Sequence, residues 1–423
     1  MGRIVSPGEI DLTQWIRAGD GVIWGQATAE PQTLVEALVA QRAAFSGAQA
    51  FMGISYSGVV RPEHADHLRL SAYCGAGRNR ALADAGVLDV CPFPYSQLAA
   101  LMNERLIRTD VALIQVSPPN PRGEYSLGLG AEYLVPALRH ARVVIAEIND
   151  QVPWTHCDRI LRSEDFSLAV QTSRPPACPP PTPAGEIERR IAAHAAAYVP
   201  DGATLETGLG SLPDAVIAAL GDRRDLGVHS GALGDSIATL MESGAITNSR
   251  KPIDTGRTVG GLLLGSPRLF EFARENPALW LRSVEHTHDP RILAQLPGFV
   301  AINSAVEVDL TGQVNAEVAN GTYVGAVGGA LDFVRAANQS AGGVSLVVLP
   351  ASVGGKRSRV VAQLSGPVAT PRSEAGVIVT ECGAADLRGA TLRERARRMI
   401  GIAHPALREG LERAASESGL LKS

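Results

Sequence analysis

The stretch "TLETGLGSLPDAV" (residues 204–216) joins the start of a strand to a Gly-x-Gly turn and a proline that opens a helix. The same order of features occurs twice. Residues 8–38 are "GEIDLTQWIRAGDGVIWGQATAEPQTLVEAL" and residues 185–220 are "GEIERRIAAHAAAYVPDGATLETGLGSLPDAVIAAL". Each copy has Gly-Glu-Ile, a helical pattern, an Asp-Gly turn, a short strand, a small-residue loop, a proline and a helix ending in Ala-Leu. Two copies are too few for a solenoid, so the repeat indicates two related α/β domains.

Further strands are predicted where apolar residues run without alternation, as in strands buried on both faces of a parallel sheet. Helical patterns separate many of them, and alternating strands and helices favour parallel sheets with right-handed crossovers. We therefore predict an α/β fold of two related open domains with mainly parallel sheets. The strands are expected at residues 111–117, 142–148, 226–230, 299–304, 344–350 and 376–381.

A proline-rich segment, "TSRPPACPPPTPAGE" (residues 172–186), separates the two copies. Prolines remove backbone donors and favour extended backbone, so no helix or central strand is expected to cross it. We predict an N-terminal α/β domain in residues 1–172. A linker follows in 173–185, and a second such domain in 186–423 carries the catalytic loops.

Composition excludes several function classes. The 423 residues carry a net charge of −4, which argues against nucleic acid as a partner. The five cysteines form no C-x-x-C pair, which indicates reduced thiols in a cytoplasmic protein. No apolar run is long enough to span a membrane. The pair His286 and His288 has no evident third ligand, so we expect no metal site.

Ligands bind beyond the carboxyl ends of parallel strands, so the residues that follow each strand are candidates. Backbone N–H groups at Gly208 and Gly210, and at Gly328 and Gly329, could hold an oxyanion. The alternatives are a tight turn at the first pair and a hairpin or bulge at the second. The basic loop "SVGGKRSRVV" (352–361) offers three cationic side chains that could contact a phosphate: Lys356, Arg357 and Arg359. The alternative is a loop that is only solvated.

Several motifs in order along the chain resemble the acetyl-CoA hydrolase/transferase group of class I CoA-transferases. The resemblance implies two related α/β domains, an acyl-CoA thioester as substrate, no permanently bound cofactor, and a homodimer or larger assembly. It makes both predicted domains CoA-transferase-like. Asn303, at the end of the strand predicted at 299–304, is a candidate for CoA binding because of that position. The motifs are "TAEPQTLVEAL" (28–38), "VSPPNPRGEYSLG" (116–128), "AEINDQVPWTH" (146–156), "GLGSLPDAV" (208–216), "GSPRLFEFARENP" (265–277), "AINSAVEVDLTGQVN" (301–315), "VGGALDFVRAA" (327–337) and "GATLRERARRMIGIAHP" (389–405).

In this family, a glutamate in a His-Ser/Thr-Glu motif attacks the thioester and becomes a glutamyl-CoA thioester. The matching residues here are His229, Ser230 and Gly231, so glycine stands at the nucleophile's position. Members usually have glutamine ahead of the Gly-x-Gly loop, where this chain has Glu206. If the two strands are neighbours, their ends lie ~5 Å apart, and Glu206 could occupy the vacated space. The alternative is that Glu206 faces solvent or pairs with an arginine.

Three functions fit these residues. In the first, Glu206, with His229, is the general base of a water-using acyl-CoA hydrolase that cleaves a thioester or a C–C bond. In the second, Glu206 is a relocated nucleophile and the chain transfers CoA to a small carboxylic acid. In the third, the chain is a non-catalytic acyl-CoA-binding subunit. We favour the first.

Overall fold

The computed structural model describes residues 3–180 and 183–421, which form two compact units. Unit 1 comprises Met1–Pro180, Gly231–Asp235 and Arg257–Asp289. Unit 2 comprises Pro181–Ser230, Ser236–Gly256 and Pro290–Ser423. Each unit is built on its own sheet, so they are described separately.

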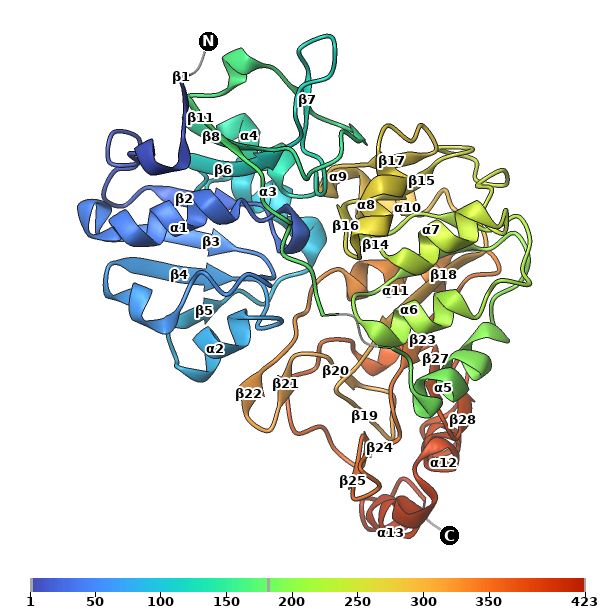
Figure 1. Ribbon diagram of the computed structural model, residues 1–423. Coiled ribbons are helices and arrows are strands. Elements are labelled where there is room, and N and C mark those ends of the chain that lie inside the picture. The colour runs from blue at the N-terminus through green and yellow to red at the C-terminus, as the bar shows by residue number, and fades with distance from the viewer. Residues whose placement is uncertain (1–2, 181–182, 422–423) are drawn as a thin grey trace. The chain divides into compact units, whose positions relative to one another are not determined.

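Unit 1 contains an eight-stranded sheet in which all neighbouring strands are parallel (Figure 1). The central strand β6 is buried at every position, because both faces of the sheet are covered. Helix α1 (Gln32–Gln41) contributes Leu34, Val35 and Leu38 to the core of this unit. The strand order is β1 (Arg3–Val5), β11 (Leu168–Thr172), β8 (Val143–Asn149), β6 (Val111–Val116), β2 (Gly21–Trp24), β3 (Ala48–Met52), β4 (Leu68–Ala72) and β5 (Leu88–Val90).

Unit 2 contains a six-stranded sheet that is parallel except for its last pair, β27 and β28. The fold class predicted from the sequence, α/β with mainly parallel sheets, is confirmed. All six strands predicted from apolar runs are present. The order in this sheet is β13 (Gly227–Val228), β12 (Thr204–Thr207), β18 (Phe299–Ser304), β23 (Val344–Val348), β27 (Val377–Thr380) and β28 (Gly383–Asp386).

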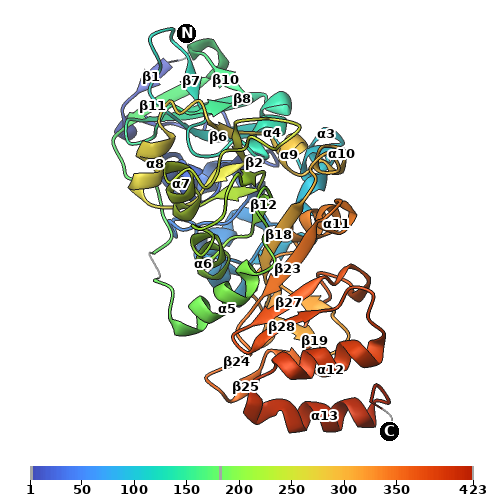
Figure 2. The same cartoon turned by 90° about the vertical axis from the view of Figure 1, so that its right-hand side faces the viewer.

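Of the two C-terminal helices, α12 (Leu392–Ile402) lies beside β28, and α13 (Arg408–Glu417) lies against α12 on its far side (Figure 2). Helix α12 begins with a capping box between Thr391 and Glu394, which satisfies backbone groups at its first turn. Apolar side chains on one face of each helix join a core cluster with β27 and β28. Each of the two helices is therefore amphipathic.

The two compact units differ from the domains predicted from the sequence in the placement of two segments. Residues 231–235 and 257–289 fall inside the predicted C-terminal domain but cluster with unit 1. The reason lies in strand pairing, because β17 (Leu279–Leu281) pairs with β9 (His156–Cys157) of the N-terminal segment. Between Thr172 and Glu186, no described residue lies in a helix or strand. Along residues 3–180 and 183–421, no helix combines the length and apolarity needed to cross a bilayer.

Candidate active site

Glu206 lies on β12, an inner strand of the unit 2 sheet, between β13 and β18. It pairs with Ala301 of β18. On its other edge, β12 pairs with β13, where Leu205 is level with Val228. The N–H of the next residue, His229, donates a hydrogen bond to Leu205 O (3.0 Å). The two strands are thus neighbours, and the register sets Glu206 level with His229, two residues before Gly231. Side chains level across parallel strands share a face of the sheet.

The Glu206 carboxyl is buried, with only 2% of the residue exposed. Asn303 Nδ2, from the end of β18, donates a hydrogen bond to Glu206 Oε2 (2.8 Å). The alternative that Glu206 faces solvent is therefore wrong. Burial raises the pKa of Glu206 to about 8, and the hydrogen bonds from Asn303 and the Ile302 backbone offset part of that shift. A carboxyl group with such a pKa can gain and lose a proton near neutral pH.

Gly208 has a packing role in this arrangement. A Cβ added at this position would lie 2.6 Å from Asn303 Oδ1, so only glycine lets Asn303 approach β12. The Gly208 N–H donates to Ile302 O (2.8 Å). The expectation that this N–H holds an oxyanion is wrong, because the N–H already donates a hydrogen bond to β18.

The other predicted backbone donors lie at helix starts. Gly210, at φ +120°, is the N-cap of α6 (Ser211–Ala218), which confirms the predicted strand-loop-helix turn. Gly328, at φ +55°, precedes Gly329, the N-cap of α11 (Ala330–Gln339). Free N–H groups and the helix dipole make such N-termini favourable places for negative charge.

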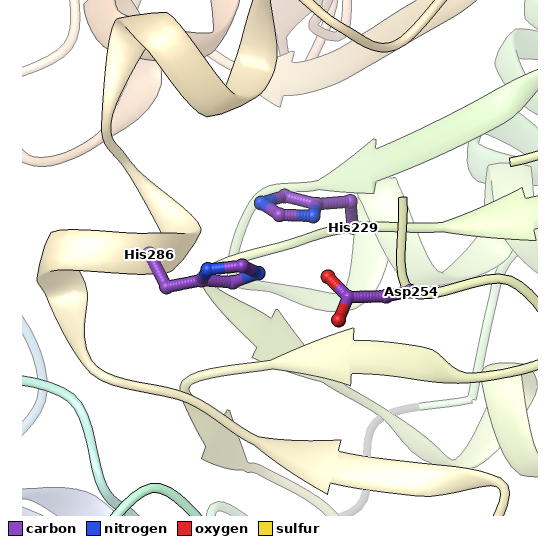
Figure 3. Close-up of side chains that lie close together, drawn as sticks. All are labelled: His229, Asp254 and His286. Atoms are coloured by element: carbon purple, nitrogen blue, oxygen red, sulfur yellow. The ribbon is translucent and has the colours of Figure 1, made fainter. Parts of the chain in front are cut away.

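His229 is fully buried, and its ring lies near the carboxylate of Asp254. The potential ligand atoms of these two residues are within 4.8 Å of one another. Figure 3 shows the Asp254 carboxylate turned toward the His229 ring; His286, drawn in the same view, belongs to unit 1. The backbone around His229 is fixed, because Ser230 Oγ donates to Thr207 O (3.1 Å) and accepts from Thr207 N (3.2 Å).

The basic loop forms a short hairpin of β24 (Ser352–Val353) and β25 (Arg357–Ser358). Lys356 and Arg357 are exposed, and Arg357 hydrogen-bonds to the Asn320 side chain. Arg359 is half-buried; burial, with the neighbouring Arg357, lowers its pKa, and Glu381 opposes that shift. The loop could meet a phosphate through its two exposed cations. Asn303, expected with them in CoA binding, donates its side-chain hydrogen bond to Glu206, and its role toward CoA stays a prediction.

Gly231 belongs to unit 1, where its carbonyl accepts from the N–H groups of Gly261 (3.0 Å) and Leu262 (3.1 Å). Close to Gly261 is a second buried carboxyl group, Glu132, which is 6% exposed. Burial raises the pKa of Glu132 to about 7. Reasoning from sequence missed this residue. A signal was present, because "GLG" at 128–130 ends two residues before it, as "GLG" at 208–210 begins two residues after Glu206.

Two family models match the chain. Residues 3–174 match the acetyl-CoA hydrolase/transferase N-terminal domain, and residues 265–415 match the acetyl-CoA hydrolase/transferase C-terminal domain. These two matches agree with the family to which the sequence motifs are similar.

Individual proteins support the same family. The chain is 36% identical to a 4-hydroxybutyrate coenzyme A transferase of Clostridium kluyveri, with 92% of each chain covered. It is 32% identical to an acetyl-CoA hydrolase of Yarrowia lipolytica, over 49% of this chain and 39% of that protein. Its structure resembles that of RipA from Yersinia pestis, with a TM-score of 0.94, 32% identity and coverage of 99% and 98%. The chain is an enzyme of the acetyl-CoA hydrolase/transferase family.

Proposed function

We propose that the enzyme hydrolyses an acyl-CoA with Glu206 as general base. The observation that carries this proposal is the buried Glu206 carboxyl at the end of β12, held by Asn303 and with a pKa raised to about 8. A general base works best when its pKa lies near the operating pH. Resemblance to the family adds that Gly231 stands where a nucleophilic glutamate would be, which favours water as the attacking group.

In the proposed step, ionised Glu206 takes a proton from water while the water oxygen attacks the thioester carbonyl carbon. The tetrahedral intermediate then breaks its C–S bond, and CoA leaves as the thiolate. Backbone N–H groups at Gly210 and at Gly328–Gly329 are proposed to stabilise the oxyanion. His229, level with Glu206 on the same face of the sheet, assists proton transfer. Water addition to a ketone followed by C–C cleavage would use the same base.

The CoA phosphates are proposed to bind Lys356 and Arg357, the exposed cations of the β24–β25 hairpin, with Arg359 behind them. Neutralising the two exposed residues should raise KM for acyl-CoA more than it lowers kcat, because the phosphates are remote from the reacting bond. A double variant of Lys356→Ala and Arg357→Ala, assayed with acetyl-CoA, measures this ratio.

The test of the proposed function is Glu206→Gln, assayed on acetyl-CoA, succinyl-CoA and 4-hydroxybutyryl-CoA. We expect thioester hydrolysis to fall by about 10²–10⁴-fold, the usual contribution of a general base. For the unchanged enzyme, kcat/KM should rise with pH and level off above about 8, because only ionised Glu206 accepts a proton. Glu409→Gln, an exposed carboxyl on α13, is the matched control. A Glu206→Gln enzyme with full turnover would refute the assignment.

CoA transfer is the second candidate. It is supported by the Clostridium kluyveri relative, which is named as a transferase and matches this chain over 92% of its length, whereas the hydrolase of Yarrowia lipolytica matches about half. In this case, Glu206 would be the nucleophile and a small carboxylic acid the acceptor. Formation of a new acyl-CoA from added acetate, succinate or 4-hydroxybutyrate, without net loss of thioester, would favour transfer. Because the chain is an enzyme of this family, the binding-only alternative is set aside.

Three expectations stay predictions. The family resemblance implies a homodimer or larger assembly, which sedimentation would measure. The reduced cysteines suggest a cytoplasmic location, which cell fractionation would test. We also retain the division into sequence domains 1–172 and 186–423, joined by the linker 173–185.

A further inference from the structure

We propose that Glu132 supplies the carboxylate that Gly231 lacks and forms the covalent intermediate with the acyl group. The inference rests on the proposed function, since it takes an acyl-CoA as the substrate and keeps Glu206 as the base for water. It changes the first step, because Glu132 rather than water attacks the thioester, and water then attacks the acyl group held on Glu132. The comparisons with known proteins assign no role to this residue.

Glu132 and Gly231 lie on either side of Gly261. A Cβ added at Gly261 would stand 2.8 Å from Gly231 O and 3.0 Å from Glu132 Cγ. A similar Cβ at Gly130 would stand 3.3 Å from Glu132 Oε1. The backbone of these two glycines therefore passes so close to this carboxyl group that no larger residue fits there, and it does so next to the position where the family nucleophile would start.

The backbone at Glu132 is in an uncommon conformation. Its φ is +28°, in the region that favours glycine. The neighbouring chain holds it there, because Glu132 forms a bridge with Ser283 and its carbonyl accepts from Val284 N (3.2 Å). A residue kept in such a conformation costs on the order of 1–3 kcal/mol, and such residues cluster at functional sites.

One carboxylate oxygen is firmly held and the other is not. Oε2 accepts hydrogen bonds from Tyr95 OH and from Gln26 Nε2, both at 2.5 Å. Gln26 is itself fixed, since its Oε1 accepts from Tyr73 OH (2.7 Å) and Ile54 N (2.9 Å). In residues 3–180 and 183–421, no group donates a hydrogen bond to Glu132 Oε1, so this oxygen keeps its lone pairs for attack.

The histidine beside this cluster is uncharged. The ring of His288 lies 4.9 Å from that of Tyr95, and burial lowers the pKa of His288 to about 3, so it is neutral. Burial raises the pKa of Glu132 to about 7, and its bonds from Tyr95 and Gln26 limit the shift. Near neutral pH, Glu132 is therefore about half ionised. A desolvated carboxylate is also a stronger nucleophile than one in water.

The covalent step balances without a further reagent. A lone pair of Glu132 Oε1 attacks the thioester carbonyl carbon, the C–S bond breaks, and CoA thiolate leaves, which forms a mixed anhydride. In hydrolysis, water then attacks the acyl carbonyl and loses a proton to a base, which releases the carboxylic acid and restores Glu132. In transfer, the thiolate attacks the Glu132 carbonyl carbon instead and displaces the acid.

The test is to add hydroxylamine or borohydride during turnover of acetyl-CoA, and to map modified peptides by mass spectrometry. We expect a hydroxamate or a reduced side chain at Glu132. Modification of Glu206 alone, or continued turnover with no adduct, would overturn the inference and leave acyl-CoA processing intact. If no acyl-CoA is consumed, the proposed function fails first and this inference fails with it.

Variants separate the covalent role from a structural one. Glu132→Gln should abolish the adduct and lower turnover by about 10³-fold or more. Because both carboxyl groups must be ionised, the acidic limb of the kcat/KM profile should contain two pKa values, that of Glu132 being the lower. Tyr95→Phe removes one hydroxyl only; it should keep the adduct and raise this lower pKa by about one pH unit, because a bond that favours the ion is lost. Glu63→Gln, an exposed carboxyl in unit 1, is the matched control. If this pKa does not change in Tyr95→Phe, the assignment of Glu132 as the nucleophile is contradicted.

Discussion

Glu206 in unit 2 and Glu132 in unit 1 are two buried carboxyl groups beside Gly-Leu-Gly turns, yet they are held differently. One side-chain amide donates to Glu206, whereas a phenol and an amide both donate to Glu132. Burial raises both pKa values, to about 8 and about 7. The comparison indicates that burial sets the direction of both shifts, while hydrogen bonds to the ionised form limit their size; the Ile302 backbone is the second such partner of Glu206.

The two backbones differ as well. Glu206 lies within a regular strand and pairs with Ala301 in a parallel ladder, so local structure fixes its direction. Glu132 has a φ of +28° and depends on contacts with residues distant in sequence. The first carboxyl is positioned by the sheet and the second by tertiary packing.

The largest expected effect in this comparison is on the pH dependence of the free energy of unfolding. Folding raises the pKa of Glu206 from 4.5 to about 8, so its protonated form is the stable one when buried. Its contribution to stability is complete below about pH 4.5 and is lost as the pH rises to about 8, by a few kcal/mol. Glu206→Gln should remove this slope. Urea unfolding of both proteins at pH 5 and pH 8 measures it, and equal slopes would contradict the shift.

A smaller effect is expected from Gly208→Ala. The added Cβ would meet Asn303 Oδ1 at 2.6 Å, so Asn303 must move and its bond to Glu206 is disturbed. We expect a loss of about 1–3 kcal/mol in the free energy of unfolding, together with reduced turnover. Gly221→Ala is the control, because a Cβ there meets nothing within 4 Å. Equal effects of the two substitutions would show that the Gly208 contact is unimportant.

Asn303→Ala tests the hydrogen bond alone. Loss of the Nδ2 donor should raise the pKa of Glu206 further, by about one pH unit, because the bond favours the ionised form. The pH at which kcat/KM levels off should move upward by the same amount. A profile identical to that of the unchanged enzyme would mean that Glu206 does not control this limb.

The smallest effect on stability is expected at an exposed ion pair, in contrast to the two buried carboxyl groups. Asp225 and Arg250 pair at 2.6 Å, with 39% and 57% of their side chains exposed. Asp225→Asn should cost less than about 1 kcal/mol, and less still at high salt. Thermal unfolding at two salt concentrations measures this. A loss as large as that of Gly208→Ala would show that surface charge matters more here than we infer.

Sequence reasoning succeeded where the signal is local. The strand-loop-helix turn around Glu206 follows from its glycines and Pro213, and the apolar runs predict the strands on either side of it. The occupied N–H of Gly208 could not be foreseen, because it depends on the register with β18.

The second carboxyl could not be found in the same way. Gln26 and Tyr95 lie 106 and 37 residues from Glu132, and no local pattern brings them together. Glutamate also rarely adopts a positive φ, so local backbone preference does not predict the conformation of Glu132. Tertiary contacts override that preference here. The assignment of residues 257–289 to unit 1 depends on strand pairing across a similar distance.

The division of the chain between the two units has a consequence for how the protein is made. The backbone passes from one unit to the other five times. During synthesis, the first 180 residues, which hold the eight-stranded sheet and its core, emerge before the later segments of the same unit, so unit 1 is complete only once residues 257–289 have emerged. Such long-range dependence slows folding and lengthens exposure of unfinished surfaces. We expect refolding from denaturant to be slow and concentration-sensitive, and fragments cut at the proline-rich segment to be aggregation-prone.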